Sequence, residues 1–285
     1  MNTVQFKDIK LSNELEVEGS VIFPFLTAIQ IDALKELFNK FHTENPQGFY
    51  ATTHAEDKDW RKQVSNEILA IIKDSIDPLF DSIDVLGGAF ISKAPGEKGI
   101  LPLHQDWNIV DEKVARSYNL WVPLVDVNEF NGAMRILGRS HQKQETYRGP
   151  NLPPTLYKIS DAVDQHMVSL NMKAGMGLLY DHALWHSSPI NQSNELRLAI
   201  VFGVIPKGAS MRFYHQNDKE LEEYVSHSEF FFQNDPKDGP KGLELNKSFP
   251  FENEILNEEQ FNQVYLGVEP KKKSSGFFGL FKRTK

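Results

Sequence analysis

Cysteine is absent from the 285-residue sequence. Without thiols the chain can form no disulfides, and thiolate zinc sites and iron–sulfur clusters are excluded as well. Any bound metal must therefore be held by nitrogen and oxygen ligands. A chain without cysteine also suits a reducing cytoplasm, where we expect the protein to reside.

Long apolar runs are missing too. The longest, residues 198–206, is roughly half the length needed to cross a bilayer, and it ends at a proline. Residues 1–19 mix charged residues with single apolar ones, so they contain no signal-peptide core. These features predict a soluble protein without a secretion signal.

Basic residues are scarce outside the C-terminus. The net charge is −8, yet residues 271–285 carry six basic residues and no acid, which leaves −14 on residues 1–270. Such an acidic body argues against nucleic-acid binding, for which a basic stripe is expected. We expect residues 271–285 to form a disordered, solvated tail. The alternative is weak contact with an anionic membrane surface, at about 1 kcal/mol per basic residue.

The apolar pattern predicts a mainly β protein with flanking helices. Helical spacing occurs in residues 25–42, behind Thr27 as an N-cap, and in residues 57–80, where Asp57 and Asp59 suit a helix N-terminus. Short β-rich runs separated by turn residues then follow, at 85–93, 118–127, 133–137, 176–180 and 196–205. Strands that follow two helices in this way indicate a helix-backed β-barrel or jelly roll.

With 40% hydrophobic residues the chain can bury one core. We therefore expect a single domain over residues 1–270, in which the helices occupy about 25–80 and the barrel about 84–206. Residues 207–270 are expected to cover the barrel, with a polar helical stretch at 218–224.

A candidate metal site begins with His104 and Asp106. Because side chains at i and i+2 of a strand share a face, these two residues can bind one metal ion. A histidine from a distant strand would complete the arrangement of two histidines and one carboxylate found in non-haem Fe(II) oxygenases. His182 and His186 are both suitable, and their spacing alone does not separate them. Two similar pairs, at 54/56 and 227/229, lie beside predicted helices rather than strands.

These segments resemble the phytanoyl-CoA dioxygenase family of Fe(II)/2-oxoglutarate-dependent oxygenases, in order over residues 88–204. The matching text is HQDW at 104–107, LWVPLVDV at 120–127, NGAMRILGRSH at 131–141 and GMGLLYDHALWHSSPINQSNELRLAI at 175–200. In that family the distal histidine ligand is followed by Asn five positions on and by Arg eleven positions on. His186 meets both spacings, with Asn191 and Arg197, whereas His182 has serines at both positions.

The resemblance implies a double-stranded β-helix of the cupin type, with Fe(II) held by His104, Asp106 and His186. It also implies 2-oxoglutarate and O2 as cosubstrates, with a two-pronged salt bridge from Arg197 to the distal carboxylate of 2-oxoglutarate. Further cosubstrate-binding positions of the family are matched by Ser188, Trp121 and Gln105.

The expected reaction is hydroxylation of an unactivated C–H bond in a small organic or acyl substrate, with release of succinate and CO2. Retention of Asp106 favours hydroxylation, since related halogenases replace this carboxylate by a small residue. The family's usual Pro-Gly-Ser-His turn appears here as Leu137-Gly138-Arg139-Ser140-His141, which keeps the turn and adds Arg139, to which the sequence assigns no role.

Several alternatives stay open at this level. The chain could be an inactive family member that binds metal or ligand, or a cupin-type metal enzyme that does not use 2-oxoglutarate. The substrate is not identified by the sequence. Residues near the motifs that could contact an anionic group, or simply lie on the surface, are Lys93, Trp107, Arg116, Arg135 and Arg148.

Overall fold

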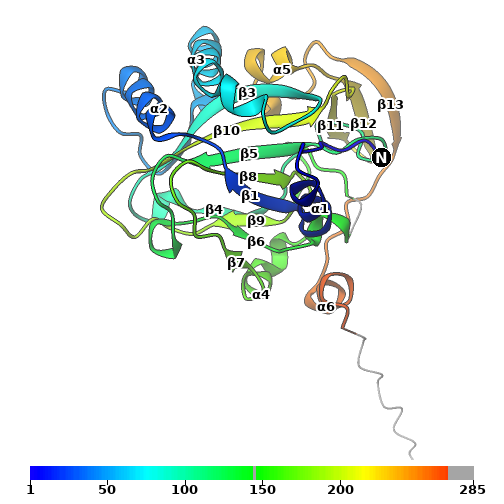
Figure 1. The fold of residues 1–285 in the computed structure, drawn as a ribbon. Coiled ribbons are helices and arrows are strands. Elements are labelled where there is room, and N and C mark those ends of the chain that lie inside the picture. Colours follow the sequence, from blue (N-terminus) through cyan, green and yellow to red (C-terminus); the bar gives the residue numbers. More distant parts are fainter. Residues whose placement is uncertain (144–145, 269–285) are drawn as a thin grey trace, which may run out of the picture.

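Two antiparallel sheets form the centre of the protein. The structure is a computed structural model in which residues 1–143 and 146–268 are described. In this part of the chain the larger sheet has the strand order β1-β8-β5-β10-β3-β2 and the smaller one the order β4-β9-β6-β7. Figure 1 shows the larger sheet above the smaller one. The strands of the larger sheet are β1 (Ser20–Pro24), β2 (Phe49–Ala51), β3 (Ile83–Lys93), β5 (Tyr118–Pro123), β8 (Met176–Asp181) and β10 (Arg197–Pro206). Those of the smaller sheet are β4 (Leu101–His104), β6 (Arg135–Ile136), β7 (Val168–Ser169) and β9 (His186–Ser188).

Apolar side chains fill the space between the two sheets. Trp121 and Leu178 from the larger sheet pack in one buried cluster with Ile136 from the smaller sheet. Fully burying a side chain of this size stabilises the fold by about 1.5–3 kcal/mol. This apolar layer therefore holds the two sheets together. The predicted fold class, a jelly roll with flanking helices, is confirmed.

Helices cover the outer face of the larger sheet. α2 (Ala28–Phe41) and α3 (Lys58–Ile76) lie above β3 and β10 in Figure 1, while α1 (Ile9–Glu18) lies beside β1. Thr27 and Gln30 form a capping box at the start of α2, and the Asp57 side chain accepts a hydrogen bond from the backbone of Trp60 at the start of α3. The two predicted helices are confirmed, whereas α1 and β1 were not predicted.

Strand pairing brings the motif residues together. β4 and β9 pair so that His104 lies opposite His186, and β10 and β3 pair so that Arg197 lies opposite Lys93. Each of these pairs joins residues about 80 to 100 positions apart in the chain. The fold thus assembles the two ends of the site from two separate strand pairs.

A third sheet follows the barrel, with the order β11-β12-β13. Its strands are β11 (Arg212–Asn217), β12 (Glu220–Val225) and β13 (Glu244–Pro250). The predicted polar helix at 218–224 is therefore wrong. Asp218, at φ 54°, makes the turn of a hairpin between β11 and β12. Glu223 is buried in β12, where it accepts hydrogen bonds from Arg212 and Tyr214, so cross-strand pairing overrides the helical pattern.

The remaining helices are short. They are α4 (Ser160–Asp164), α5 (Ser228–Gln233) and α6 (Glu258–Leu266). α6 packs Phe261 in one cluster with Trp185, the residue just before β9, and the Trp185 indole N–H donates to the Tyr265 hydroxyl at 3.0 Å. α6 thus packs next to the smaller sheet, and the expected covering role of residues 207–270 as a whole stays a prediction.

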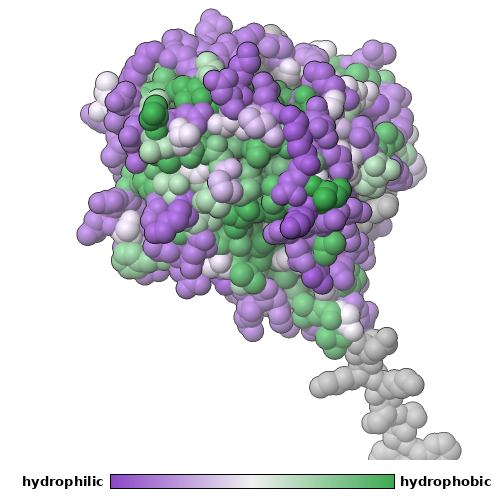
Figure 2. All heavy atoms as spheres, in the orientation of Figure 1, coloured by the Kyte–Doolittle hydropathy of each residue, from purple (hydrophilic) through white to green (hydrophobic). Residues whose placement is uncertain are grey.

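Hydrophilic residues surround the face shown in Figure 2, and hydrophobic residues gather over its middle. None of the described helices is long and apolar enough to span a membrane. The predicted basic tail at 271–285 lies outside the described residues, and the single-domain boundary at 270 stays a prediction.

Candidate active site

Three side chains converge at the edge of the space between the sheets. His104 ends β4, Asp106 follows two residues later, and His186 begins β9. The Nε2 atoms of His104 and His186 lie 3.8 and 3.9 Å from the two Asp106 carboxylate oxygens, and all three donor atoms lie within 4.8 Å of one another. Donors on one octahedral face are about 3 Å apart when a metal ion binds them. The donor atoms would therefore have to approach one another by up to about 2 Å to share an ion.

Hydrogen bonds orient both imidazole rings toward this centre. The Nδ1 atom of His104 lies 2.8 Å from the Pro102 carbonyl, and Nδ1 of His186 lies 2.9 Å from the Leu184 carbonyl. A carbonyl can only accept, so each Nδ1 carries the proton and each Nε2 keeps its lone pair for a metal. Burial, with His104 alongside, lowers the pKa of His186 to about 4, so this imidazole is neutral and able to bind a metal ion at neutral pH.

The Asp106 carboxylate is ionised and held in place. Burial alone would raise its pKa, but the neighbouring histidines, with His186 first, and a hydrogen bond from Asn119 lower it to about 2. The Asn119 amide donates to Asp106 Oδ2 at 2.8 Å and lies 3.5 Å from the Tyr180 hydroxyl. Sequence reasoning missed Asn119, although its place two residues before Trp121 on β5 puts it on the same inward face.

A second part of the site is formed by Arg197 and Ser188. Arg197 is 3% exposed, and its Nη1 donates to the Gly132 carbonyl and to the Ser188 hydroxyl, the latter at 3.0 Å. Its guanidinium carbon lies 5.5 Å from the centre of the Trp121 ring. No described acid pairs with Arg197, and its buried Nε has no hydrogen-bond partner among the described residues. An unpaired buried cation of this kind is prepared for an anion.

Lys93 is a second buried basic side chain beside Arg197. It is fully buried, and its ammonium group donates to the Ser188 hydroxyl at 2.6 Å, the Ser188 carbonyl at 2.8 Å and the Pro189 carbonyl at 2.5 Å. No described carboxylate forms an ion pair with it. Burial, together with the neighbouring Arg197, lowers the pKa of Lys93 to about 6. From the sequence, Lys93 could be either a charge on the surface or a contact for an anion. Its burial excludes a position on the surface.

One cavity of about 250 Å³ contains both parts of the site. His104, Asp106 and His186 line it together with Ser188 and Arg197. Drug-sized binding sites have volumes of roughly 300–1,000 Å³. The cavity is therefore suited to a small metabolite that reaches from the metal ligands to Arg197. Trp121 also lines it, as expected from the sequence.

A profile of the phytanoyl-CoA dioxygenase (PhyH) family matches residues 20–199, more than half of the chain. The chain belongs to the phytanoyl-CoA dioxygenase family. No protein in a search of curated sequences matches it.

Solved structures with a similar fold are 2-oxoglutarate enzymes by their descriptions. The α-ketoglutarate-dependent non-haem carbocyclase SnoK from nogalamycin biosynthesis is 15% identical, with a TM-score of 0.51 over 72% of this chain and 85% of that one. The epimerase SnoN, in complex with Fe3+, α-ketoglutarate and nogalamycin RO, is 16% identical, with a TM-score of 0.51 over 87% of this chain and 94% of that one. EvdO2 from Micromonospora carbonacea var. aurantiaca, complexed with 2-oxoglutarate, is 16% identical, with a TM-score of 0.47 over 72% and 94%.

At these identities the likeness shows the fold, the jelly roll of the phytanoyl-CoA dioxygenase family. The family assignment supports the general class, non-haem enzymes that depend on 2-oxoglutarate. It does not specify hydroxylation, because a carbocyclase and an epimerase are among the similar structures.

Gln105, the middle residue of the family's HQD motif, does not line the site. Its amide donates to the Ala183 carbonyl at 2.6 Å, its carbonyl oxygen accepts from Thr146 at 3.4 Å, and the residue does not line the cavity. The reason is the alternation of side chains along an extended chain, which turns Gln105 away when its two neighbours point at the metal position. We correct its expected role: Gln105 holds the backbone near Ala183.

The structure separates the two candidate histidines. His182 is buried, its Nδ1 lies 3.0 Å from the Ser117 hydroxyl, and it is not one of the three clustered donors. His186 occupies that place, as the family spacing to Asn191 implies. His54, which we set aside from the sequence because it precedes a helix, does line the cavity, on the wall formed by the 3-10 turn Thr52–His54.

The other basic residues near the family motifs have acidic partners. Arg116 binds Asp181 and Glu112, Arg148 binds Glu112, Arg135 binds Asp164, and Arg139 binds Glu18. Ion pairing occupies these side chains, so they are not open contacts for an anionic substrate. Arg139 also adopts φ 62° in the turn that replaces the family's usual one.

Proposed function

We propose that the protein is an Fe(II)/2-oxoglutarate-dependent dioxygenase that hydroxylates an unactivated C–H bond of a small organic or acyl substrate. One observation carries this proposal. A triad of two histidines and a carboxylate shares a small cavity with an Arg197 side chain that has no acidic partner among the described residues.

The donor set suits Fe(II). Two neutral imidazoles and one carboxylate are the ligands of the facial triad, and they leave the other positions around the ion free for cosubstrates. When bound, Fe(II) with 2-oxoglutarate and O2 supplies the oxidising power for C–H hydroxylation, and succinate and CO2 are the coproducts. The chain itself contributes the orientation of the ligands. The Pro102 and Leu184 carbonyls fix the two imidazole rings, and Asn119 fixes Asp106.

Arg197 is assigned to the distal carboxylate of 2-oxoglutarate. Its Nη1 is occupied by Gly132 and Ser188, whereas no described residue accepts a hydrogen bond from its Nε or Nη2. These two atoms form one edge of the planar guanidinium, the geometry that binds a carboxylate through two parallel hydrogen bonds. Ser188 holds the other edge of the guanidinium in position.

Lys93 does not line the cavity, and it is assigned an indirect role in binding the same carboxylate. It reaches the site through the Ser188 hydroxyl, which accepts from both Lys93 and Arg197 and itself donates to the Gly132 carbonyl at 2.8 Å. In the empty site, burial beside Arg197 favours the neutral form of Lys93, and a bound carboxylate would favour its charged form. This pair of basic side chains supports a dicarboxylate cosubstrate.

The apolar wall of the cavity is assigned to substrate contact. Phe49 and Ile91, on the neighbouring strands β2 and β3, line it together with His54. A cavity this small, with apolar walls, accommodates only the part of a substrate that reacts. Such a wall also excludes water, which limits unproductive oxidation.

The proposal is tested by following 2-oxoglutarate labelled at its first carboxyl carbon. We expect iron-dependent release of labelled CO2 with formation of succinate, and loss of both in Asp106→Ala. Glu36→Ala, which removes an exposed acid on α2, is the matched control and should keep full activity. Release that does not depend on added iron, or that continues in Asp106→Ala, would count against the assignment.

A further inference from the structure

Asp106 lies just beyond the end of a strand. β4 ends at His104, whose partner on β9 is His186, and residues 105–117 then form an irregular connection to β5. Neither the backbone N–H nor the backbone carbonyl of Asp106 forms a hydrogen bond with the backbone of another described residue. Strand pairing therefore does not fix the position of this proposed metal ligand, and side chains have to do so.

Arg148 provides the missing contact from a distant part of the chain. Its Nε donates to the backbone carbonyl of Asp106 at 2.7 Å. Its backbone N–H donates to the Asn108 side-chain oxygen at 2.5 Å, and its backbone carbonyl accepts from the Asn108 N–H at 3.2 Å. Asp106 is thus held at two places, by Asn119 on its carboxylate and by Arg148 on its backbone.

Glu112 fixes the orientation of the Arg148 guanidinium. Arg148 is 7% exposed, and its Nη1 and Nη2 bind the two Glu112 oxygens, the first at 3.2 Å, while Nη1 also donates to the Thr146 carbonyl at 3.1 Å. Burial would raise the pKa of Glu112, but Arg148, followed by Arg116, holds it below its ordinary value, so this acid is ionised. A two-pronged ion pair gives a planar guanidinium one preferred orientation, and here that orientation directs Nε at the Asp106 carbonyl.

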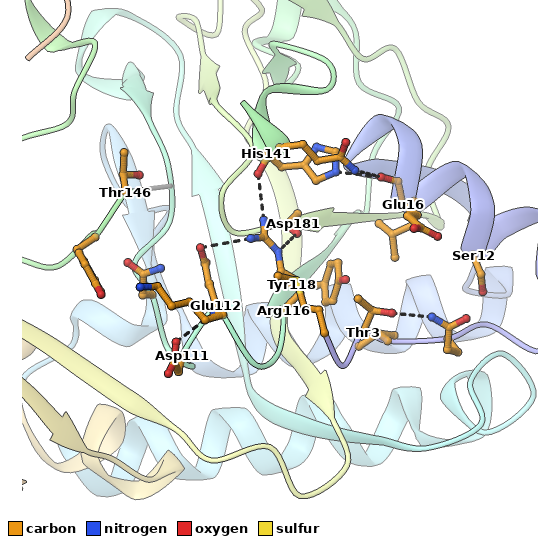
Figure 3. A pocket seen from close by; sticks show the side chains of 18 of the residues that line it. Thr3, Ser12, Glu16, Asp111, Glu112, Arg116, Tyr118, His141, Thr146 and Asp181 are labelled. Carbon is orange, nitrogen blue, oxygen red and sulfur yellow. Dashed lines mark hydrogen bonds and ion pairs between the residues drawn. The ribbon is translucent and has the colours of Figure 1, made fainter. Parts of the chain in front are cut away.

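Arg116 belongs to the same ion-pair network but makes no contact with Asp106. It donates to both Asp181 oxygens, at 2.7 and 2.8 Å, and its Nη1 lies 3.4 Å from a Glu112 oxygen (Figure 3). Its Nη2 also donates to the His141 carbonyl at 3.3 Å. The two arginines therefore allow the stability of the network to be separated from the position of the metal ligand.

We propose that Arg148 is a positioning residue for the metal site, because its Nε–H holds the Asp106 backbone where the carboxylate faces His104 and His186. This inference rests on the metal site proposed above. The three donor atoms, which lie within 4.8 Å of one another, have to approach further to share an ion. A backbone that is already held loses less conformational freedom when the ion binds, so the affinity for the metal is higher.

Two substitutions of Arg148 isolate the contribution of its Nε–H. The side-chain nitrogen of glutamine lies as many bonds from the backbone as Nε of arginine, whereas methionine places a methyl group there and has no donor. Arg148→Gln and Arg148→Met both remove the ion pair with Glu112, so both should lower the stability of the metal-free protein to a similar extent. Only Arg148→Met also removes the donor to Asp106.

The test is titration of the metal-free full chain with Mn(II), in which electron paramagnetic resonance measures the free ion. We expect Arg148→Met to raise the dissociation constant about 10- to 100-fold, the usual effect of removing a group that orients a metal ligand. Arg148→Gln should recover most of the affinity. Arg116→Met is the matched control, since it removes a buried ion pair from the same network and should keep the affinity of the parent protein.

A double variant covers the case in which Arg148→Met does not fold. Glu112→Gln/Arg148→Met leaves no unpaired acid beside residue 148, and it is compared with Glu112→Gln alone. The expected rise in the dissociation constant for Mn(II) is the same.

An affinity of Arg148→Met equal to that of the parent would overturn the proposal, because Asp106 would then need no support from residue 148. Equal weakening by Arg148→Met and Arg148→Gln, or by Arg148→Met and Arg116→Met, would overturn it too, since the loss would then follow the ion pairs and not the Nε–H. A parent protein that binds no Mn(II) would overturn the metal site and this proposal with it.

Discussion

The variant Lys93→Met tests what Lys93, as distinct from Arg197, contributes to the binding of 2-oxoglutarate. Methionine has nearly the shape of lysine without its charge, so it can occupy the channel beside Arg197 while removing the ammonium group that contacts Ser188 and Pro189. If Lys93 helps to hold the distal carboxylate, the variant should lose affinity for 2-oxoglutarate and keep its affinity for Fe(II) alone.

The magnitude follows from the contacts. Hydrogen bonds that involve a charged group contribute about 1.5–3 kcal/mol, which corresponds to a dissociation constant for 2-oxoglutarate that is roughly 10- to 150-fold higher in the variant. In the empty protein Lys93 is mostly neutral at neutral pH, so Lys93→Met removes its hydrogen bonds to Ser188 and Pro189 and should lower the free energy of unfolding by about 1–3 kcal/mol. A purely structural role for Lys93 predicts this loss of stability without any loss of affinity for 2-oxoglutarate.

The pH dependence has a definite sign. Burial lowers the pKa of Lys93 to about 6 from an ordinary value of 10.5. Between these values the unfolded chain holds the proton and the empty folded protein does not, so this residue makes the free energy of unfolding rise with pH across that window. A bound carboxylate restores the charge. Binding of 2-oxoglutarate should therefore take up a proton above pH 6 and weaken as the pH rises, and Lys93→Met should show neither effect.

The assay compares two keto acids under anaerobic conditions with Fe(II) present. 2-Oxoglutarate and 2-oxovalerate have the same chain length, but only the first carries a distal carboxylate. We expect Lys93→Met to weaken binding of 2-oxoglutarate and to leave that of 2-oxovalerate unchanged. Equal weakening of both keto acids would refute the reasoning, because it would mean that the substitution distorts the site as a whole.

Three other changes test separate parts of the account. Asp106→Ala should abolish iron-dependent turnover, and a variant with full activity in an oxygen-consumption assay would remove Asp106 from the ligand set. Arg197→Ala should raise the apparent 2-oxoglutarate requirement by orders of magnitude, since breaking a buried bidentate pair costs about 3–5 kcal/mol; an unchanged requirement in steady-state kinetics would contradict the assignment. Leu120→Ala, at a fully buried position of β5, should lower the free energy of unfolding by about 2–5 kcal/mol in urea titrations. A loss below about 1 kcal/mol would mean that the apolar cluster between the larger sheet and α2 and α3 is not part of the core.

Much of the fold could be predicted because local signals agreed with it. Thr27 and Asp57 cap α2 and α3 as their positions in the sequence indicated, and the β-rich runs coincide with β3, β5, β6, β8 and β10. The shorter strands β1, β2, β4, β7 and β9 lie outside these runs. The stretch 218–224 could not be assigned in the same way. Its alternation of polar and apolar residues is too short to distinguish a strand from a helix. What makes it a strand is the pairing of β12 with β11 on one side and with β13 on the other.

The site was predictable where spacing along the chain carries the information. The separation of His104 from Asp106, and of His186 from Arg197, is fixed by strand geometry and by the family pattern. Asn119 was missed and the role of Lys93 was left open, because both roles arise from register between strands, which a single sequence does not display. The role of Gln105 was misassigned because a motif letter does not say to which side of the chain its side chain points.

The most direct test of the central claim is an anaerobic absorption titration of the metal-free protein with Fe(II) and then 2-oxoglutarate, repeated with His186→Ala and His182→Ala. Our account predicts a visible metal-to-ligand charge-transfer band in the intact protein that survives His182→Ala and disappears in His186→Ala. Absence of the band from the intact protein, or its persistence in His186→Ala, would contradict the proposed iron and 2-oxoglutarate site.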